Sequence, residues 1–477
     1  MGCQDRLSKG TESGYNALVM LRRLGNTLSR IAERVVPDPF VLVLGLTLLV
    51  LLAGALHLNL AGGEQPAGGV AARLLLGWYH GFWNPDGLVF AVQMCLILIT
   101  GHTLAVSGPV RRLIEAAARL PRGPAGAAAL VSAVSCVAAL LHWGLGAVAG
   151  ALLAREMARV APERGVRLHY PLLGAAAYTG MALWHGGLSG SAPLKVAESG
   201  HFLASTTGEI PLADTLLSPL NLAVCGALLV LVPALCWALA PRRPEDCVAP
   251  IRTAEPVAPT APARPEAPAR PALERFQCSA WPGRVLGLIG LALVLTALVS
   301  GRVTLDLSSV IVAFLLAAIV LHGSLTGFAA SVGEAARGAG AILIQFPLYF
   351  AILGVLRAGD LVHWLAASLA EQTGPSTLPV VSFLSAGLVN LFVPSGGGQW
   401  TVQGEILATA GAAAGVDPVT TVMAFAYGDA WTNMLQPFWA LPLLAITGLQ
   451  ARQIIGYTAV IFALLAIVVP PMLWLLG

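Results

Sequence analysis

Charged residues are scarce in this chain. Asp, Glu, Lys and Arg make up 11% of its 477 residues, hydrophobic residues make up 57%, and the mean hydropathy is +0.78. A soluble domain carries about 25% charged residues. The composition therefore excludes an ordinary soluble protein and indicates an all-α polytopic membrane protein. The net charge of +3 is spread over many short loops, so nucleic acid is not an expected partner.

Cysteine is sparse as well, and its spacing excludes two further kinds of site. The seven cysteines include no CxxC pair, and their number is odd. We expect reduced, structural thiols, and neither a disulfide framework nor a metal site. No cofactor is expected.

Four breaks rich in glycine, serine or polar residues interrupt the apolar runs, at matching places in the two halves of the chain. They lie at 142–146 and 185–193 in the first half, and at 390–398 and 429–437 in the second. Backbone that leaves a helix inside a bilayer persists only where protein or a water-filled cavity satisfies its amides. Such paired breaks are the best sequence indication of a transporter's binding site.

A nearly constant offset between similar residues indicates that the two halves are distant duplicates. The matched pairs, 248 to 252 residues apart, are Gln93 with Gln345, His142 with Asn390, Ala177 with Ala426, and Pro193 with Pro442. Each match is weak alone, but four at one offset make chance a poor explanation.

Runs of about 20 apolar residues, the length that spans a bilayer, predict about nine spans and two hairpins. The spans are expected near 40–58, 87–107, 171–195, 214–239, 283–300, 307–322, 339–357, 419–447 and 453–476. The runs 125–154 and 376–410 are broken centrally, and we expect re-entrant hairpins there. The spans 171–195 and 419–447 are expected to be broken helices.

These elements divide the chain into five segments. They are a cytoplasmic N-terminal segment (1–36), a first membrane repeat (37–240), a Pro-, Ala- and Arg-rich cytoplasmic linker (241–281), a connecting span (282–306) and a second membrane repeat (307–477). The linker cannot form a core and is expected to be a semi-rigid tether. The connecting span has no counterpart in the first half, so it inverts the second repeat and allows the two hairpin tips to meet near the midplane.

The basic residues support this topology. With the N-terminus in the cytoplasm, 23 of the 27 Lys and Arg residues fall in cytoplasmic segments, as the positive-inside rule requires. The exceptions are Arg73, Lys195, Arg302 and Arg357. No cleavable signal peptide is expected, because the first apolar run begins near Phe40, behind a charged N-terminus.

Several uncommon strings occur together in the order of one known family. They are GWYHGFWN at 77–84, TGHTLA at 100–105, GLSGSAPL at 187–194, VPSGGGQW at 393–400 and QPFWALP at 436–442. From about residue 37 to the C-terminus, apart from the linker, the sequence resembles the bacterial short-chain fatty acid transporter family.

The resemblance implies a secondary active transporter of short monocarboxylates, such as butyrate or acetoacetate, in the bacterial inner membrane. The wider ion transporter superfamily builds carriers from inverted repeats with hairpins and commonly moves them as an elevator. The implied partners are the monocarboxylate, a coupling proton or sodium ion, the lipid bilayer and, as the oligomer to test, a homodimer. His142 and His185 depart from the family pattern, which has Asn and Gly there, and this leaves the coupling ion open.

The breaks also predict an anion site from their own chemistry. Free N–H groups at helix N-termini suit a carboxylate, glycines allow close approach of the backbone, and serine hydroxyls add donors. The candidate substrate-binding residues are Ser189, Gly190, Ser191, Asn390, Ser395, Gly396, Gly397 and Gly398. Close helix packing is the alternative, but Pro394 followed by three glycines disrupts a helix and favours a site.

Three residues are candidates for coupling transport to a proton or cation. Asp429 is the acid expected deepest in a span, beside Asn433, and charge there is expensive and usually functional. The alternative is that Asp429 pairs with a neighbouring helix. His142 can exchange protons near neutral pH, although a neutral structural histidine fits equally well.

Two other classes of function match parts of the sequence. The string GLSG at 187–190 resembles the GxSG of intramembrane serine proteases. A serine nucleophile needs a histidine within hydrogen-bond reach, and the histidines that follow lie near span ends or in loops. A passive anion channel would favour filter segments repeated around a pore. The sequence therefore favours a carrier, not an enzyme.

Overall fold

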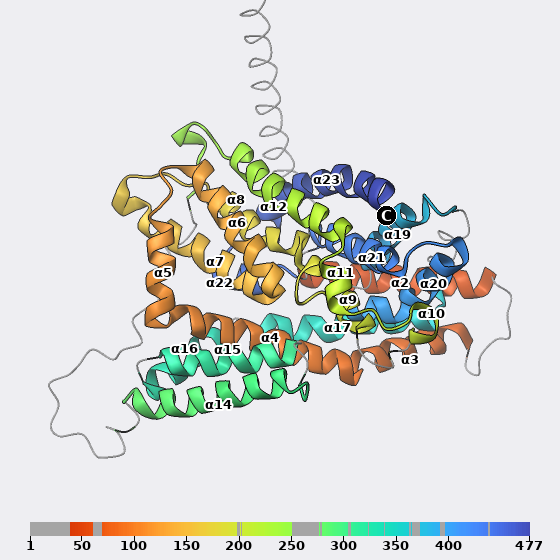
Figure 1. Cartoon of the computed structure of the whole chain (residues 1–477), viewed down its shortest axis with the longest axis horizontal. Coiled ribbons are helices and arrows are strands. Elements are labelled where there is room, and N and C mark those ends of the chain that lie inside the picture. Colours follow the sequence, from red (N-terminus) through yellow and green to blue (C-terminus); the bar gives the residue numbers. More distant parts are fainter. Residues whose placement is uncertain are drawn as a thin grey trace, which may run out of the picture.

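The computed structural model describes most of the chain. The described residues are 39–60, 69–197, 201, 203–249, 276, 279–303, 307–322, 324–337, 339–361, 364, 373–391, 396–436 and 439–477. Within them the fold is all-helical and contains no β-strand (Figure 1). The predicted fold class is thereby confirmed. The N-terminal segment 1–36, most of the 241–281 linker and Ser395 lie outside the described residues.

The described part of the first half contains eight longer helices and several short ones. They are α2 (Pro39–Leu60), α3 (Gly69–Phe82), α4 (Pro85–Val106), α5 (Gly108–Ala118), α6 (Pro124–Leu141), α7 (Trp143–Val160), η1 (Pro162–Arg164), α8 (Tyr170–Tyr178), η2 (Thr179–Ala182), η3 (Trp184–Gly186), α9 (Ser191–Val196), α10 (Ala204–Thr207), α11 (Leu212–Leu216), α12 (Pro219–Leu239) and η4 (Pro244–Asp246).

The second half repeats much of this order. Its described helices are α14 (Trp281–Val299), α15 (Leu307–Leu321), α16 (Leu325–Ala336), α17 (Gly340–Ala358), α19 (Leu378–Asn390), α20 (Gly396–Ala414), α21 (Pro418–Asn433), α22 (Leu441–Thr447) and α23 (Ala451–Leu476).

Proline and capping residues set many of the helix starts. Proline occupies one of the first two positions of α4, α6, α12 and α21, where its missing N–H has no helical partner to lose. The side chains of Asn84, Ser218 and Asp417 each accept a hydrogen bond from a backbone N–H in the first turn that follows, which satisfies one of the free donors there. These local signals explain why most helix ends lie within a few residues of the predicted spans.

Six described helices are long and apolar enough to cross a membrane. They contain Val43–Leu60, Gly87–Leu104, Pro124–Leu141, Pro219–Leu239, Trp281–Val299 and Ala451–Leu476, and shorter apolar helices contain Ile311–Leu321, Leu343–Ala358 and Leu378–Asn390. The sequence prediction had treated Pro124–Leu141 as one arm of a hairpin, although its length alone would allow it to span. Helices α3, α5 and α16 were not predicted, because each is too short to meet the length criterion for a span.

Both predicted hairpins consist of two helices that fold back on each other. The first pair, α6 and α7, is separated by His142, and a Cβ on Gly146 would lie 2.8 Å from the backbone nitrogen of Ala139. In the second pair, the Nε2 of Gln399 on α20 donates to the carbonyl oxygen of Ala386 on α19 at 2.8 Å. Neither segment is a continuous helix.

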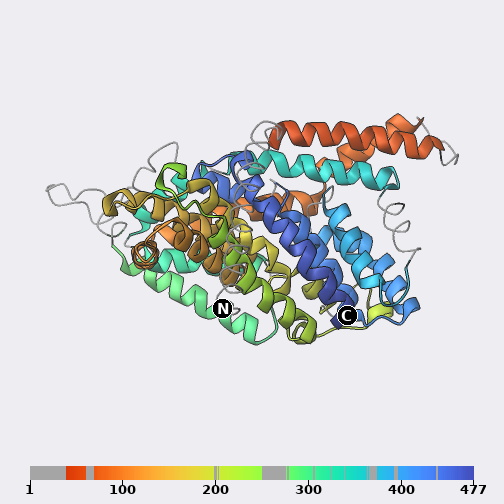
Figure 2. The same ribbon diagram turned by 90° about the horizontal axis from the view of Figure 1, so that it is seen from above.

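The helices fall into two groups that draw on both halves of the chain. One group contains α2, α3, α4 and α14 to α17, and the other contains α6 to α9, α12 and α19 to α23. In Figure 1 helices α3, α4, α14, α15 and α16 form the lower layer, with α6, α8, α12 and α23 above. Figure 2 shows α2 and α17 running together along one edge. The two groups meet chiefly where α4 packs on α7.

Several helix contacts between the halves occur twice, the second time between the corresponding helices of the opposite halves. Helix α3 packs on α17 and α16 packs on α4, while α2 packs on α17 and α15 packs on α4. Likewise, α7 packs on α22 and α20 packs on α9. If α2, α3, α4, α7 and α9 correspond to α15, α16, α17, α20 and α22, each contact has a counterpart with the halves exchanged.

Glycines allow the closest of these crossings, between α3 and α17. A Cβ on Gly77 would lie 2.8 Å from the carbonyl oxygen of Gly354, and a Cβ on Gly354 would lie 2.9 Å from the Cα of Gly81. Small residues four apart let membrane helices approach in this way. The glycines of the GWYHGFWN string therefore serve helix packing.

Candidate functional site

The break in the first half and the broken helix α21 in the second half meet at a buried histidine–aspartate pair. His185, in η3, places its Nε2 2.8 Å from the Oδ2 of Asp429, in α21, and both side chains are 1% exposed. Among the described residues, no lysine or arginine forms a salt bridge with Asp429. The carboxylate is therefore held by a group whose own charge depends on a proton.

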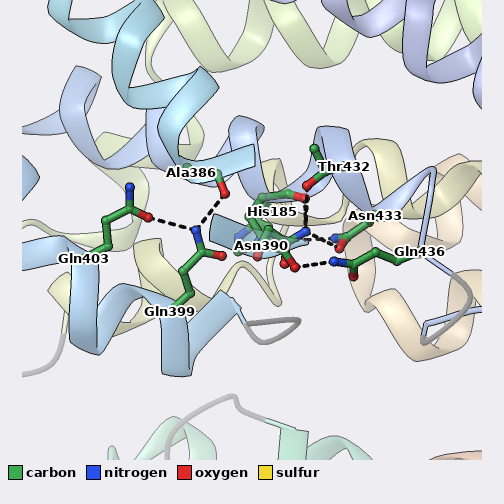
Figure 3. A network of polar contacts seen from close by, with 9 residues as sticks. His185, Ala386, Asn390, Gln399, Gln403, Thr432, Asn433 and Gln436 are labelled. Atoms are coloured by element: carbon green, nitrogen blue, oxygen red, sulfur yellow. Dashed lines mark hydrogen bonds and ion pairs between the residues drawn. The ribbon is translucent and has the colours of Figure 1, made fainter. Parts of the chain in front are cut away.

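A network of amides lies next to this pair, and Figure 3 shows three of them, Asn390, Asn433 and Gln436, close to His185. The Nδ2 of Asn390, at the end of α19, donates to the carbonyl oxygen of Asp429 at 2.9 Å and to the Oδ1 of Asn433 at 2.8 Å. Asn433 in turn donates to the Oδ2 of Asp429 at 3.2 Å. Asn390 and Asn433 are 0% exposed, so the end of the second hairpin's first helix is fixed to the broken helix behind it.

The network extends to three further polar residues. Nε2 of Gln436 donates to the carbonyl oxygen of Asn390. The Tyr178 hydroxyl, from α8, donates to the Asn433 carbonyl oxygen at 2.8 Å. The Asn390 amide also donates to the Thr432 hydroxyl at 3.0 Å. Both halves of the chain thus contribute to one polar cluster.

The glycine- and serine-rich segments of the two halves also meet here. A Cβ on Gly396, the first residue of α20, would lie 2.8 Å from Cε1 and Nε2 of His185 and 3.3 Å from Oγ of Ser191. A Cβ on Gly397 would lie 3.8 Å from Cβ of Ser191. Gly396 therefore allows a tight approach to the side chain of His185, whereas Gly397 has ordinary room; approach of these glycines to a ligand stays a prediction. Gly398 lies in the same first turn.

The remaining serine and glycine of the first break hold the hairpins in place. The Oγ of Ser189 accepts a hydrogen bond from the backbone N–H of Trp143 at 3.0 Å. Leu188 donates its backbone N–H to the Leu140 carbonyl oxygen at 2.8 Å. Gly190 precedes α9. The tip of the first hairpin is thus tied to the break whose other end packs against Gly396.

His142 forms no hydrogen bond with His185 or Asp429. Its Nδ1 accepts a hydrogen bond from the Gly144 N–H at 3.1 Å, which caps α7, and its ring contacts Phe314. Protonation at Nδ1 would abolish that cap. The geometry therefore supports the structural alternative for His142.

Sequence reasoning did not select His185, Tyr178 or Gln436 as site residues. Their roles depend on partners more than 40 residues away in the chain. The sequence could have indicated His185, because a buried Asp429 needs a partner and the first-half break at 185–193 contains a histidine. Among the described residues, no group of three or more His, Cys, Asp or Glu residues could hold a metal ion.

Comparison with known proteins identifies the family. The sequence profile described as "Short chain fatty acid transporter" matches residues 20–476. The chain belongs to this family. The "Putative short-chain fatty acid transporter" of Escherichia coli K12 is 36% identical over 446 residues, covering 93% of this chain and 98% of that protein. A relative of the same name from Haemophilus influenzae is 32% identical, covering 93% of this chain and 97% of that protein.

A solved structure of more distant sequence also aligns with the transporter. The YdaH transporter of Alcanivorax borkumensis is 14% identical, with a TM-score of 0.43, and the alignment covers 92% of this chain and 98% of that chain.

Membership of a family of transporters agrees with the expectation that the chain is not an enzyme. The geometry at the GLSG string agrees as well. The Nε2 of His185 bonds to Asp429 and its Nδ1 has no hydrogen-bond partner, so neither ring nitrogen bonds to Ser189 or Ser191. The arrangement that a serine nucleophile requires is therefore not formed between His185 and either serine.

Proposed function

We propose that this protein is a secondary active transporter that carries a short monocarboxylate, such as butyrate or acetoacetate, across the bacterial inner membrane together with a proton or sodium ion. The observation that carries the proposal is the meeting of both broken segments at the buried His185–Asp429 pair. In carriers built from inverted repeats, the substrate site is typically formed where the broken helices of the two repeats meet inside the protein.

The charge of Asp429 supports coupled transport. Two unit charges 4 Å apart repel by about 4 kcal/mol at an effective dielectric constant of 20. A substrate carboxylate next to an ionised Asp429 would therefore need a compensating proton or cation. Asp429 and Asn433 are the proposed coupling residues, and Ser189, Gly190, Ser191, Asn390 and Gly396 to Gly398 the proposed surroundings of the carboxylate.

The exchanged helix contacts support an inverted repeat. Pairs such as α3 with α17 and α16 with α4 are what a two-fold axis between the halves would generate. We infer re-entrant hairpins at α6–α7 and α19–α20, with the N-terminus and the 241–281 linker in the cytoplasm. The positive-inside bias supports that orientation.

The division into two helix groups supports an elevator motion. The group with α6 to α9 and α19 to α23 contains the whole polar cluster, and it meets the other group chiefly at α4 and α7. A compact group that carries the site could slide against a fixed one formed by α2 to α4 and α14 to α17.

Uptake into proteoliposomes tests the function. The purified protein should accumulate labelled butyrate, with saturation, when an inward proton or sodium gradient is imposed, and should stop doing so when the gradient is collapsed. Uptake that never exceeds equilibrium and does not saturate would indicate a passive anion channel instead.

A further inference from the structure

Two buried ring nitrogens next to each other in η3 have no hydrogen-bond partner. The Nδ1 of His185 and the Nε1 of Trp184 are both buried and both lack a hydrogen-bond partner. Their rings lie against each other, with centroids 3.7 Å apart and a tilt of 41°. Buried polar groups are nearly always hydrogen-bonded. The indole N–H of Trp184 is a donor, and the Nδ1 of His185 becomes one when the ring is protonated, so the pair points to an acceptor that arrives from outside.

The His185 ring is held between the two breaks. Its Nε2 bonds to Asp429, and Gly396 of the second hairpin approaches the Cε1–Nε2 edge of the ring. The free Nδ1 lies on the other side of Cε1. The imidazole therefore has one nitrogen fixed to the coupling carboxylate and one available to a ligand.

Resting on the proposed function, we propose that His185 is the residue that binds the substrate carboxylate, and that it does so only when it carries the transported proton. In the empty state, neutral His185 donates its Nε2–H to the Asp429 carboxylate. A proton then adds to Nδ1, and the resulting N–H donates to the incoming carboxylate, with Trp184 Nε1–H as a second donor. One proton and one monocarboxylate enter and leave together, so no net charge is moved by substrate and proton.

Protonation of His185 solves the charge conflict at this position. Without the extra proton, His185 and Asp429 together carry one negative charge, and a second carboxylate would be repelled. With it, the pair is neutral and offers a charged donor, which makes a stronger hydrogen bond than a neutral one. The same proton that permits binding is thus the proton that is transported.

His142, at the end of α6, is the other histidine near the pair; its Nδ1 caps α7, its Nε2 is buried without a hydrogen-bond partner, and it does not bond to Asp429. The remaining ionisable groups do not offer a proton carrier near neutral pH. The elements packed on η3 carry Cys136 on α6, Lys195 on α9 and Tyr427 on α21, with Tyr178 and Cys225 nearby on α8 and α12. Phenols and thiols are ordinarily neutral at pH 7 and lysine is ordinarily charged. His185 is the group suited to change its charge in this range.

The surroundings of the His185 Nδ1 and the Trp184 Nε1 also suit the short alkyl tail of a monocarboxylate. Trp184 lies 6.4 Å from Trp143 and 6.2 Å from Trp439, and these two rings are 5.0 Å apart, measured between centroids. All three side chains are buried. Aromatic surface beside a carboxylate-binding donor favours a monocarboxylate with a small apolar tail over an inorganic anion.

Binding of butyrate to the purified protein, measured by titration calorimetry between pH 5.5 and 8, tests the proposal. The affinity should fall as the pH rises, by up to about tenfold per pH unit for one proton bound with each carboxylate. Titrations in buffers of different ionisation enthalpy should show that close to one proton is taken up per butyrate. A wild-type affinity that follows sodium concentration and ignores pH would overturn the proposal.

Three variants separate His185 from a general structural effect. His185→Gln should bind butyrate at least about tenfold more weakly at pH 5.5 and lose the pH dependence. Trp184→Phe should bind a few-fold more weakly but keep it, because only a neutral donor is removed. His322→Gln is the matched control, since His322 is also buried and its Nε2 bonds to the Thr103 carbonyl oxygen at 2.8 Å. It should match the wild type.

The results of these experiments distinguish a failure of the proposed role of His185 from a failure of the proposed transporter function. If His185→Gln kept both affinity and pH dependence, the role of His185 would be refuted while the transporter function stood. If the wild type bound and transported no short monocarboxylate at any pH, the function itself would be wrong. If His185→Gln did not fold, Trp184→Phe and the proton count of the wild type would still decide the matter.

Discussion

The two halves place a buried polar cluster at the same point of the fold, but the two clusters differ in chemistry. In the first half, the Ser132 and Thr179 hydroxyls lie 2.9 Å apart, and Ser135 donates to the Ala177 carbonyl oxygen at 2.6 Å. In the second half, the Asn390 Oδ1 and Asp429 Oδ1 atoms are buried without a partner. The first cluster contains only hydroxyls and is satisfied, whereas the second contains a titratable carboxylate and is incomplete.

Packing explains why the first cluster cannot copy the second. At the offset of 249 residues, the counterpart of Asp429 is Gly180. A Cβ on Gly180 would lie 2.7 Å from the Ser135 carbonyl oxygen and 2.8 Å from the Ala139 Cβ. No side chain fits there without displacing α6. The position of Gly180 is thus closed by packing, whereas Asp429, 249 residues later, carries a titratable carboxylate that pairs with His185 of the first half.

Replacing Asp429 should have the largest effect. It tests whether the carboxylate of the second-half cluster is needed for transport. In Asp429→Asn the His185 ring loses its charged partner, and breaking a buried pair typically costs 3–5 kcal/mol. Butyrate accumulation driven by a gradient should fall by at least about 100-fold, while butyrate binding falls less. Accumulation ratios in proteoliposomes provide the measurement.

Asp417→Asn is the control for that substitution. Asp417 is an exposed acid at the start of the same helix, where it caps α21. It should accumulate butyrate almost as the wild type does. Normal accumulation by Asp429→Asn would make Asp429 structural and would remove the functional difference between the halves.

Adjacent glycines provide a sharper test of where the halves touch. Gly396→Ala places a Cβ 2.8 Å from the His185 ring, which must then shift, whereas Gly397→Ala places one 3.8 Å from the Ser191 Cβ. We expect at least about a tenfold loss of initial uptake for Gly396→Ala, on the scale of one lost charged hydrogen bond. Gly397→Ala should change uptake by less than about twofold, since ordinary contacts cost little. Equal uptake by both variants would contradict the contact between His185 and the second hairpin.

Much of the fold could be predicted because the constraints are local. Span length follows from bilayer thickness, and proline or a capping residue marks the start of helices such as α4, α12 and α21. The short helices α3 and α16 escaped because neither length nor hydropathy distinguishes them from loops. They are held instead by packing on the other half of the chain, α3 on α17 through glycines and α16 on α4.

The site was only partly predictable for a related reason. Asp429, Asn390 and Asn433 were found because polar groups in a span are expensive. His185 was not selected, because its importance comes from a partner 244 residues away. His142 looked equivalent to Asn390, but it caps its own hairpin helix, while Asn390 bonds across to α21. Sequence patterns locate breaks, but pairing across them depends on tertiary structure.

An intermediate effect is expected for Asn390, which links the second hairpin to the broken helix. Asn390→Ala leaves the Asn433 Oδ1 without this donor and removes a hydrogen bond to the Asp429 carbonyl oxygen, and an unsatisfied buried group costs about 1–3 kcal/mol. Uptake should fall roughly tenfold, with a lower melting temperature. Asn59→Ala, which removes an exposed hydrogen bond to the Ala55 carbonyl oxygen, is the control. A stable, fully active Asn390→Ala protein would show that the network is dispensable.

The smallest effect is expected in the first-half cluster, where Ser132→Ala tests whether hydroxyls serve packing alone. Thr179 keeps its hydrogen bond to the Ala176 carbonyl oxygen at 2.7 Å, so its hydroxyl is not left unsatisfied when Ser132 loses its own. The free energy of unfolding should fall by only about 1 kcal/mol, and uptake and its pH dependence should stay within about twofold of wild type. Thermal denaturation and proteoliposome uptake on the same preparation check both values. A folded Ser132→Ala protein with strongly reduced uptake would mean that the first-half cluster takes part in transport. The contrast between this hydroxyl cluster and the cluster around Asp429 would then fail.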